Sequence, residues 1–205
     1  MSRSTAVWFG VAGVMSLFTW VIFNVGDPVY YDATTLTDYA AVVGLTGSFV
    51  VTGIALILLW RDPPVKRGSL FLLFAGIGAI AEGVGDLLED AFGVEDAVWL
   101  FFGGGLLMMA SLIVAGVAAL TVRSPRRWSG LFLLFAAPGA MLGIGAVMLG
   151  VSWILFGLWI VYEHRAFVIA LAVAAVAALA IAIDLYWSDI TRCIGQTQTS
   201  LAECE

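Results

Sequence analysis

The sequence contains few charged residues. Only 12% of its 205 residues are charged, whereas 62% are hydrophobic and the mean hydropathy is +1.04. A soluble domain of ordinary composition carries about a quarter charged residues. Apolar surface this extensive cannot be hidden in one water-facing core, so lipid must be the solvent for much of it. The composition therefore predicts an integral membrane protein of the cell membrane, with membrane lipid as its main partner.

The scarcity of basic residues and histidine argues against several functional classes. Nine basic residues are scattered against fifteen acids, so nucleic acid is not an expected partner. Lys66 is the sole lysine, which leaves the last predicted span without a Schiff base for retinal. His164 is the sole histidine and cannot supply a pair of haem ligands or begin a convincing metal site. No cofactor is evident, apart from a bound cation considered below.

Motifs that would identify an enzyme are also missing. The sequence has no phosphate-binding loop, no Gly-x-Ser-x-Gly elbow and no His-Glu-x-x-His pair. These absences favour a protein that is not an enzyme, without deciding the point. The acid-rich, lysine-poor balance suits a protein from strong brine. A high-GC genome explains the same bias equally well.

Seven apolar stretches predict an all-α, polytopic transmembrane bundle over residues 1–187, followed by a short polar tail over 188–205. A helix needs about 20 apolar residues to cross the hydrocarbon core. A single helix over 129–162 would be roughly 50 Å long, against a core of ~30 Å, so we predict a tight turn at 149–152. One long tilted helix, with six spans in all, is the alternative. The predicted spans are Ala6–Asn24, Tyr39–Trp60, Ser69–Leu88, Ala97–Val122, Ser129–Met148, Val151–Tyr162 and Ala166–Trp187.

The loops predict the orientation of these spans. Basic residues favour the cytoplasmic side, so the N-terminus is expected inside and the C-terminus outside. Tryptophans near span ends, Trp60, Trp128, Trp153, Trp159 and Trp187, are expected to form an interfacial belt. The predicted inner loops carry Arg61, Lys66, Arg67, Arg123, Arg126 and Arg127, and the predicted outer loops carry Asp27, Asp32, Asp38, Glu89, Asp90, Glu95 and Asp96.

Two helix pairs have similar sequences. Ser69–Ala75 is echoed by Gly130–Ala136, and each follows a basic loop that contains proline. The pattern predicts a parallel hairpin repeat over 69–122 and 129–162, although leucine, phenylalanine and glycine also recur by chance. Glycines in these spans are expected to bring helices close together, and Pro138 is expected to kink the fifth span.

The main candidate site is an acidic cluster in the third span. Glu82, Asp86, Glu89 and Asp90 have spacings that place them on one side of a helix. Acids within a span are costly and are functional candidates by default. Two carboxylates one turn apart repel, so one should hold a proton or share a cation. The alternative is that the outer three lie at the water surface, and Asp184 is a further candidate with the same alternative.

Other polar residues have simpler interpretations. Asn24, Thr19, Thr46 and Thr52 are expected to form hydrogen bonds between helices. Cys193 and Cys204 lie in the tail, where an extracytoplasmic location predicts a disulfide.

Three functions are compatible with these features. The first is a small transporter, channel or sensor that handles a cation or proton at an outward acidic site. The second is an accessory subunit whose glycine-rich faces pack against another membrane protein or a second copy. The third is an intramembrane enzyme that modifies a lipid.

Overall fold

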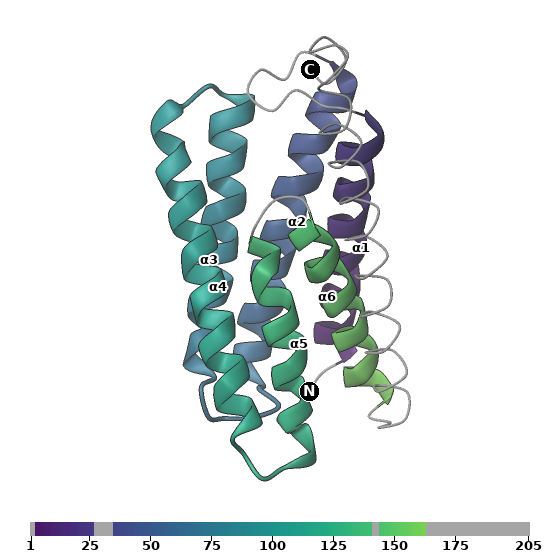
Figure 1. Cartoon of the computed structure of the whole chain (residues 1–205), viewed down its shortest axis with the longest axis vertical. Helices are drawn as coiled ribbons and strands as arrows, with labels where there is room; N and C mark the ends of the chain where they lie inside the picture. The colour runs from purple at the N-terminus through teal and green to yellow at the C-terminus, as the bar shows by residue number, and fades with distance from the viewer. Residues whose placement is uncertain (1–2, 27–34, 141–143, 163–205) are drawn as a thin grey trace, which may run out of the picture.

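The computed structural model describes residues 3–26, 35–140 and 144–162, and these residues form helices without any strand (Figure 1). Four segments are long and apolar enough to cross a membrane: Arg3–Ile22, Asp38–Arg61, Leu70–Ala91 and Glu95–Leu120. The predicted all-α class is thus confirmed for the described residues, and the first four predicted spans coincide with helices that are long and apolar enough to cross a membrane. The seventh predicted span, together with Asp184, His164 and both cysteines, lies outside the described residues.

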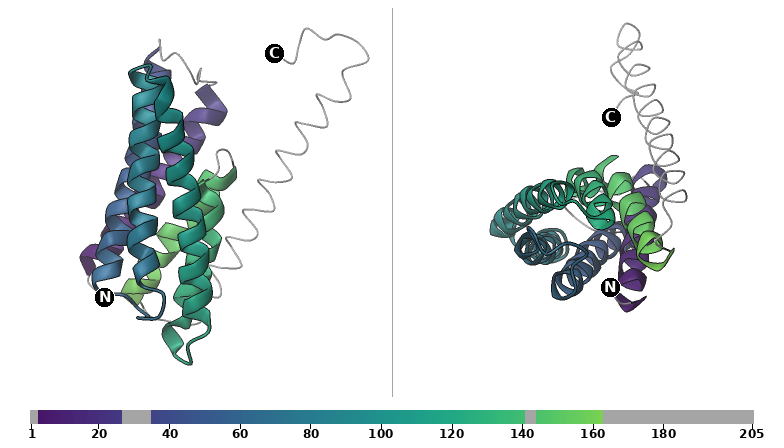
Figure 2. Two further views of the ribbon diagram at one scale, coloured as in Figure 1. Left: turned by 90° about the vertical axis from the view of Figure 1, so that its left-hand side faces the viewer. Right: turned by 90° about the horizontal axis from the view of Figure 1, so that it is seen from below.

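The helices form a closed ring. Each helix packs against the next one along the chain, and α6 returns to α1 (Figure 2). The upper ends of α5 and α6 lie near the middle of the longer helices in Figure 1, so this pair forms a short hairpin. The helices are α1 (Arg3–Gly26), α2 (Leu36–Arg61), α3 (Leu70–Asp86), α4 (Val98–Leu120), α5 (Ser129–Ala136) and α6 (Ile144–Tyr162).

Residues 129–162, predicted as the fifth and sixth spans, are divided into helices at a different place than the sequence predicted. Helix α5 ends at Ala136, and a 3-10 turn, η4 (Ala137–Ala140), contains Pro138. Proline lacks the N–H of the helical ladder and its ring clashes with the carbonyl four residues earlier, so it ends the helix here. Helix α6 then runs unbroken through 149–152. Both the turn predicted there and the alternative of one long helix are therefore wrong.

Glycine contacts explain why Gly150 is not a turn residue. A Cβ on Gly150 would lie 2.9 Å from the Gly13 carbonyl oxygen of α1, so glycine is needed for helix contact. Helix α3 makes such contacts on both sides. Gly83 packs against the Thr46 carbonyl of α2, and Gly78 packs against Gly104 of α4. Small residues let helices approach where lipid offers no hydrophobic drive for association, as the sequence predicted.

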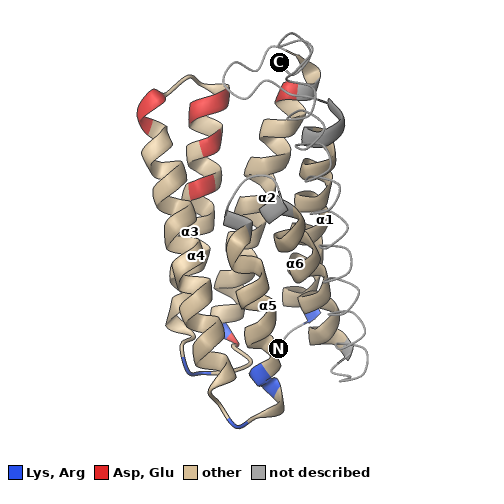
Figure 3. Cartoon of the chain, viewed as in Figure 1, with Lys and Arg blue, Asp and Glu red and all other residues tan. Residues whose placement is uncertain are grey.

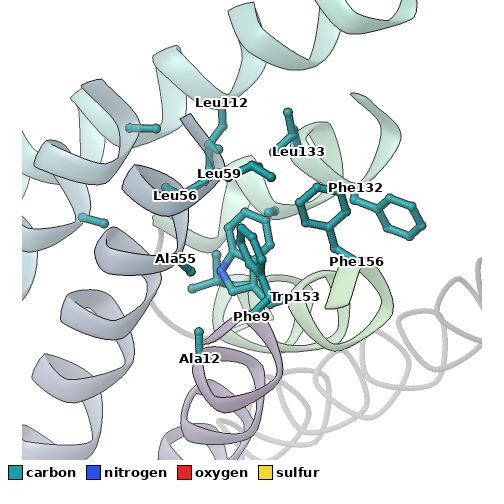
Figure 4. Close-up of a cluster of buried hydrophobic side chains, with 14 of the residues drawn as sticks. Phe9, Ala12, Ala55, Leu56, Leu59, Leu112, Phe132, Leu133, Trp153 and Phe156 are labelled. Atoms are coloured by element: carbon teal, nitrogen blue, oxygen red, sulfur yellow. The ribbon is translucent and has the colours of Figure 1, made fainter. Parts of the chain in front are cut away.

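Aromatic side chains fill the interior between α1, α5 and α6. Phe9 lies 4.9 Å from both Trp153 and Phe156, measured between ring centroids, and Phe132 lies 5.6 Å from Phe156 (Figure 4). Trp153 is fully buried and Trp159 is only 8% exposed. The prediction that these two tryptophans belong to an interfacial belt is therefore wrong. Their spacing along α6 turns them toward the ring's interior.

Charged residues separate to the two ends of the bundle (Figure 3). Every described lysine and arginine lies at the end where α1 begins and α2 ends. The described acids lie at the opposite end, with the exception of Asp62, which follows α2. This segregation agrees with the division of the loops into a basic and an acidic set.

Asp38 has a structural role that the sequence analysis missed. It lies in the first turn of α2 rather than in the preceding connection, and it is 2% exposed. The Thr35 N–H donates to its Oδ2 at 2.7 Å, and its own N–H donates to Thr35 Oγ1 at 3.2 Å. The two residues form a capping box that satisfies donors at the helix start. The Thr-x-x-Asp spacing could have identified it.

Candidate functional site

The inward face of α3 changes from apolar to acidic toward one end. Leu72, Ala75, Ala79, Glu82 and Asp86 recur at spacings of three and four, and all are buried. Glu82 is 1% exposed and Asp86 is 4% exposed. The sequence prediction that Glu82 lies within the span is confirmed, and the structure adds that it faces the interior of the bundle.

Glu82 is surrounded closely by other helices. A Cβ on Gly104 would lie 2.9 Å from the Glu82 Cα, so α4 packs directly against this turn of α3. On the other side, Gly83 packs against Phe49 and the Thr46 carbonyl of α2. The Glu82 Oε2 nonetheless has no hydrogen-bond partner among the described residues. An unpaired buried oxygen costs about 1–3 kcal/mol, so this arrangement needs an explanation beyond packing.

Asp86 lies one turn from Glu82 and has a polar partner. Thr46 Oγ1 of α2 donates a hydrogen bond to Asp86 Oδ2 at 2.9 Å. The predicted interhelix hydrogen bond of Thr46 is therefore confirmed. Thr19 donates instead to the Met15 carbonyl of its own helix, and the side chain of Asn24 is not among those described.

Glu89 and Asp90 lie farther out and are half-buried. They belong to a π-helical turn, η1 (Leu87–Ala91), that continues α3. Gly93, at φ +66°, ends the turn, and its N–H donates to the Glu89 carbonyl at 3.0 Å. Of the four predicted acids, two are thus buried inside the bundle and two line its acidic end. Isolated π turns are frequent at functional sites.

The site contains no nearby positive charge among the described residues. Their lysines and arginines all lie at the opposite end of the bundle, and α1, α2 and α4 present no ionisable side chain beside Glu82. No three described carboxylate, histidine or cysteine side chains converge as metal ligands. Glu82 and Asp86 therefore lie one turn apart on α3, and within the described structure the Thr46 hydroxyl is the side-chain donor that hydrogen-bonds to this pair.

Three further polar groups, which the sequence analysis did not connect with the site, are buried without partners. Thr52 Oγ1, Ser129 Oγ and the Trp153 indole nitrogen form no hydrogen bond within the described part of the chain. The interhelix bond predicted for Thr52 is thus not observed there. Sequence alone gives no signal for such unpartnered atoms, because they depend on which helix faces meet.

Comparisons with protein-family models, curated proteins and solved structures found no match to this chain. The function must therefore be argued from the acidic site itself.

Proposed function

We propose that the chain is a multi-pass protein of the cell membrane that takes up and releases protons at Glu82. The supporting observation is the fully buried Glu82 carboxyl, which has an oxygen without a partner in the described structure. Ionising a carboxyl in a low-dielectric interior is costly, and the neighbouring Asp86 adds like-charge repulsion. A proton removes both costs.

The same reasoning assigns roles to the neighbouring groups. Asp86 is the next proton acceptor toward the acidic end, and the hydrogen bond from Thr46 holds it in place. Glu89 and Asp90 raise the local concentration of cations at the entrance. Each transfer moves one proton from a carboxyl to water or to the next carboxylate.

The geometry favours a proton over a divalent ion. Calcium takes six to eight oxygen ligands and magnesium requires near-ideal octahedral coordination. The described residues supply no converging set of three ionisable ligands. A monovalent cation shared by Glu82 and Asp86 is the competing outcome that experiment must separate from a proton.

In the proposed orientation the acidic end faces outward and the basic end faces the cytoplasm. Helix α5 begins and helix α6 ends toward the basic end, so one further span over the predicted Ala166–Trp187 would place the C-terminus outside. Cysteines introduced singly by Lys66→Cys, Asp32→Cys and Glu95→Cys test it, in a background without Cys193 and Cys204. An impermeant reagent on intact cells should label positions 32 and 95 but not 66, whereas labelling at 66 would reverse the orientation.

The other two functions gain no support from the described structure. Most described glycines of α3, α4 and α6 are used in contacts within the chain, Gly78, Gly104 and Gly150 among them, whereas Gly103 of α4 has no described atom within 4 Å of a Cβ, so one outward glycine on these helices makes no extended face for a partner subunit. The acids do not converge as a metal centre for lipid chemistry.

Proton movement into proteoliposomes, followed with an enclosed pH-sensitive dye, tests the proposal. When the outside of the vesicles is made more acidic than the inside, protons should enter the wild-type protein at the acidic end of its bundle and acidify the vesicle interior. Glu82→Gln should abolish this proton flux. Glu95→Gln is the matched control, because Glu95 is an exposed acid at the same end and should retain full flux. Equal flux in wild type and Glu82→Gln, or sodium or potassium flux in place of proton flux, would contradict the proposal.

A further inference from the structure

Four buried side-chain polar atoms have no hydrogen-bond partner among the described residues, and one of them, Ser129 Oγ, lies at the first residue of α5, at the basic end of the bundle. The other three are Thr52 Oγ1 of α2, Glu82 Oε2 of α3 and the Trp153 indole nitrogen of α6. Thr52 and Trp153 are 0% exposed and Glu82 is 1% exposed. Buried polar groups that lack a protein partner are usually satisfied by internal water.

Thr52 and Glu82 come from facing turns of antiparallel helices. Gly83 of α3 packs against Phe49 of α2, and Gly53 of α2 packs against Ile80 of α3. Thr52 lies between Phe49 and Gly53 along α2, and Glu82 lies between Ile80 and Gly83 along α3. Both side chains are buried in the ring, with Glu82 about one turn closer to the acidic end.

Trp153 approaches the same part of α2 from the other side of the ring. Its ring lies 4.9 Å from Phe9, and in the view of Figure 4 the indole nitrogen lies on the side of the ring toward Ala55 of α2. Thr52 precedes Ala55 by three residues and therefore lies one turn away on the same face of α2. Glu82, Thr52 and Trp153 thus follow one another from the acidic end toward the centre.

Small side chains recur on the buried faces of α1, α2 and α3. Ala12, Ala55, Ala75 and Ala79 come from three helices and are all 0% exposed. Alanine fills little of the space between helices, and the hydroxyl, the carboxyl and the indole N–H offer the several hydrogen bonds that an internal water requires.

We infer that ordered water occupies the interior between Glu82, Thr52 and Trp153 and extends the proton path inward from Glu82. The water site itself stands on the three unpartnered atoms, and its role as a path rests on the proposed function. Glu82 would pass its proton to a bound water, which releases another proton to the next water, so no oxidant or second reactant is needed. Among the described residues of α3, Asp86 is the ionisable residue nearest to Glu82 along the helix, and it lies toward the acidic end.

The Trp153 indole N–H reports on this water directly. In protein labelled with nitrogen-15 on tryptophan, with the signal assigned by Trp153→Phe, the wild-type indole should exchange in D2O within hours and show magnetisation transfer from water. Thr52→Val preserves shape but removes the hydroxyl, and should slow the exchange at least tenfold. Thr52→Ser, the matched control, should exchange like wild type.

Two results would overturn the inference. A wild-type Trp153 indole N–H that stays protonated for days in D2O, without magnetisation transfer from water, would show a dry interior. This measurement uses the wild-type protein and does not depend on the folding of any variant. Equal exchange in wild type and Thr52→Val would remove Thr52 from the water site.

The outcome is distinguishable from failure of the proposed function. Thr52-dependent exchange without Glu82-dependent proton flux would support the water site and contradict the proton role. Glu82-dependent flux with a dry indole would support the proton role and contradict the water path.

Discussion

Helices α3 and α6 both pack against their neighbours through glycine, but the side chains on their inward faces differ in polarity. Both approach a neighbour through glycine: a Cβ on Gly78 would lie 2.7 Å from the Gly104 carbonyl oxygen, and one on Gly157 would lie 2.8 Å from the Ala6 carbonyl oxygen. On α6 the inward face carries Phe156 and Trp159, whose rings stack at 5.8 Å with an interplanar angle of 12°.

On α3 two of the inward positions, Glu82 and Asp86, carry acids. Aromatic rings contribute dispersion and stacking to a lipid-embedded core, whereas an acid at mid-helix costs on the order of 2.5–3.5 kcal/mol. Glycine packing alone would work equally well with alanine at position 82, as it does at Ala75 and Ala79 of the same face. The inward aromatic side chains of α6 are therefore explained by their contribution to stability. The carboxyl of Glu82 is not explained in this way, and we assign it a function for that reason.

The largest expected effect comes from filling a glycine contact on α3. In Gly104→Leu, the new side chain would meet backbone atoms of Glu82 and Gly78, which cannot move aside without separating the helices. We expect a loss of about 3 kcal/mol, at the upper end of overpacking effects. Gly103→Leu is the matched control, because nothing in the described structure lies within 4 Å of a Cβ there. Equal unfolding midpoints of the two variants in detergent would refute the glycine-packing account.

Truncating the aromatic interior of α6 should have the next largest effect. Phe156 is 0% exposed and Phe102 is 57% exposed. Lipid is as apolar as the core, so the transfer term nearly vanishes and the cavity term remains, on the order of 2 kcal/mol for Phe156→Ala. Phe102→Ala should change stability by less than about 0.5 kcal/mol. Thermal unfolding of both variants measures the difference, and a similar loss in each would show that the cluster is not a core.

A smaller effect is expected where α2 supports the acidic site. Thr46→Val removes the hydrogen bond to Asp86 and should destabilise the protein by about 1 kcal/mol. Thr46→Ser keeps the hydroxyl and should be nearly neutral. If the valine and serine variants unfold at the same temperature, the bond between Thr46 and Asp86 contributes nothing to holding the site.

The smallest effect on stability should come from the acid itself. Glutamine mimics a protonated glutamate, so Glu82→Gln should leave the unfolding temperature unchanged or slightly raised at neutral pH. Sodium, magnesium or calcium should not alter this comparison. Should one of these ions stabilise wild type but not Glu82→Gln, Glu82 would be an ion ligand, because a ligand bound to the native state raises its stability by mass action.

Sequence patterns predicted the helices well wherever hydrophobicity alone defines them. The first four apolar helices, and the position of Glu82 within the third of them on one side with the other acids, follow from apolar length and a spacing of three to four residues. The division of 129–162 was misplaced because Gly150 was interpreted as a turn signal. Its neighbour on α1, which only the folded structure reveals, makes it a contact residue, and Pro138 carried the real break.

Features that depend on which faces meet could not be predicted. The bond from Thr46 to Asp86 joins residues 40 positions apart, and the burial of Thr52, Glu82 and Trp153 with an unpartnered polar atom each depends on how three helices pack. Trp153 was assigned to the membrane interface because it lay near a predicted span end. Because the helix break lies at Pro138 instead, Trp153 lies in the middle of α6 and inside the core.

The central claim, that Glu82 is a buried carboxyl that carries a proton, is tested most directly by its reaction with an apolar carbodiimide, which adds to protonated carboxyl groups. Peptide mass spectrometry of the folded wild type at neutral pH should locate an adduct at Glu82, and Glu82→Gln should lack it. Protein unfolded at acidic pH serves as the control for chemical reactivity at this position. An unmodified Glu82 in folded protein, alongside a modified one in the unfolded control, would contradict the claim.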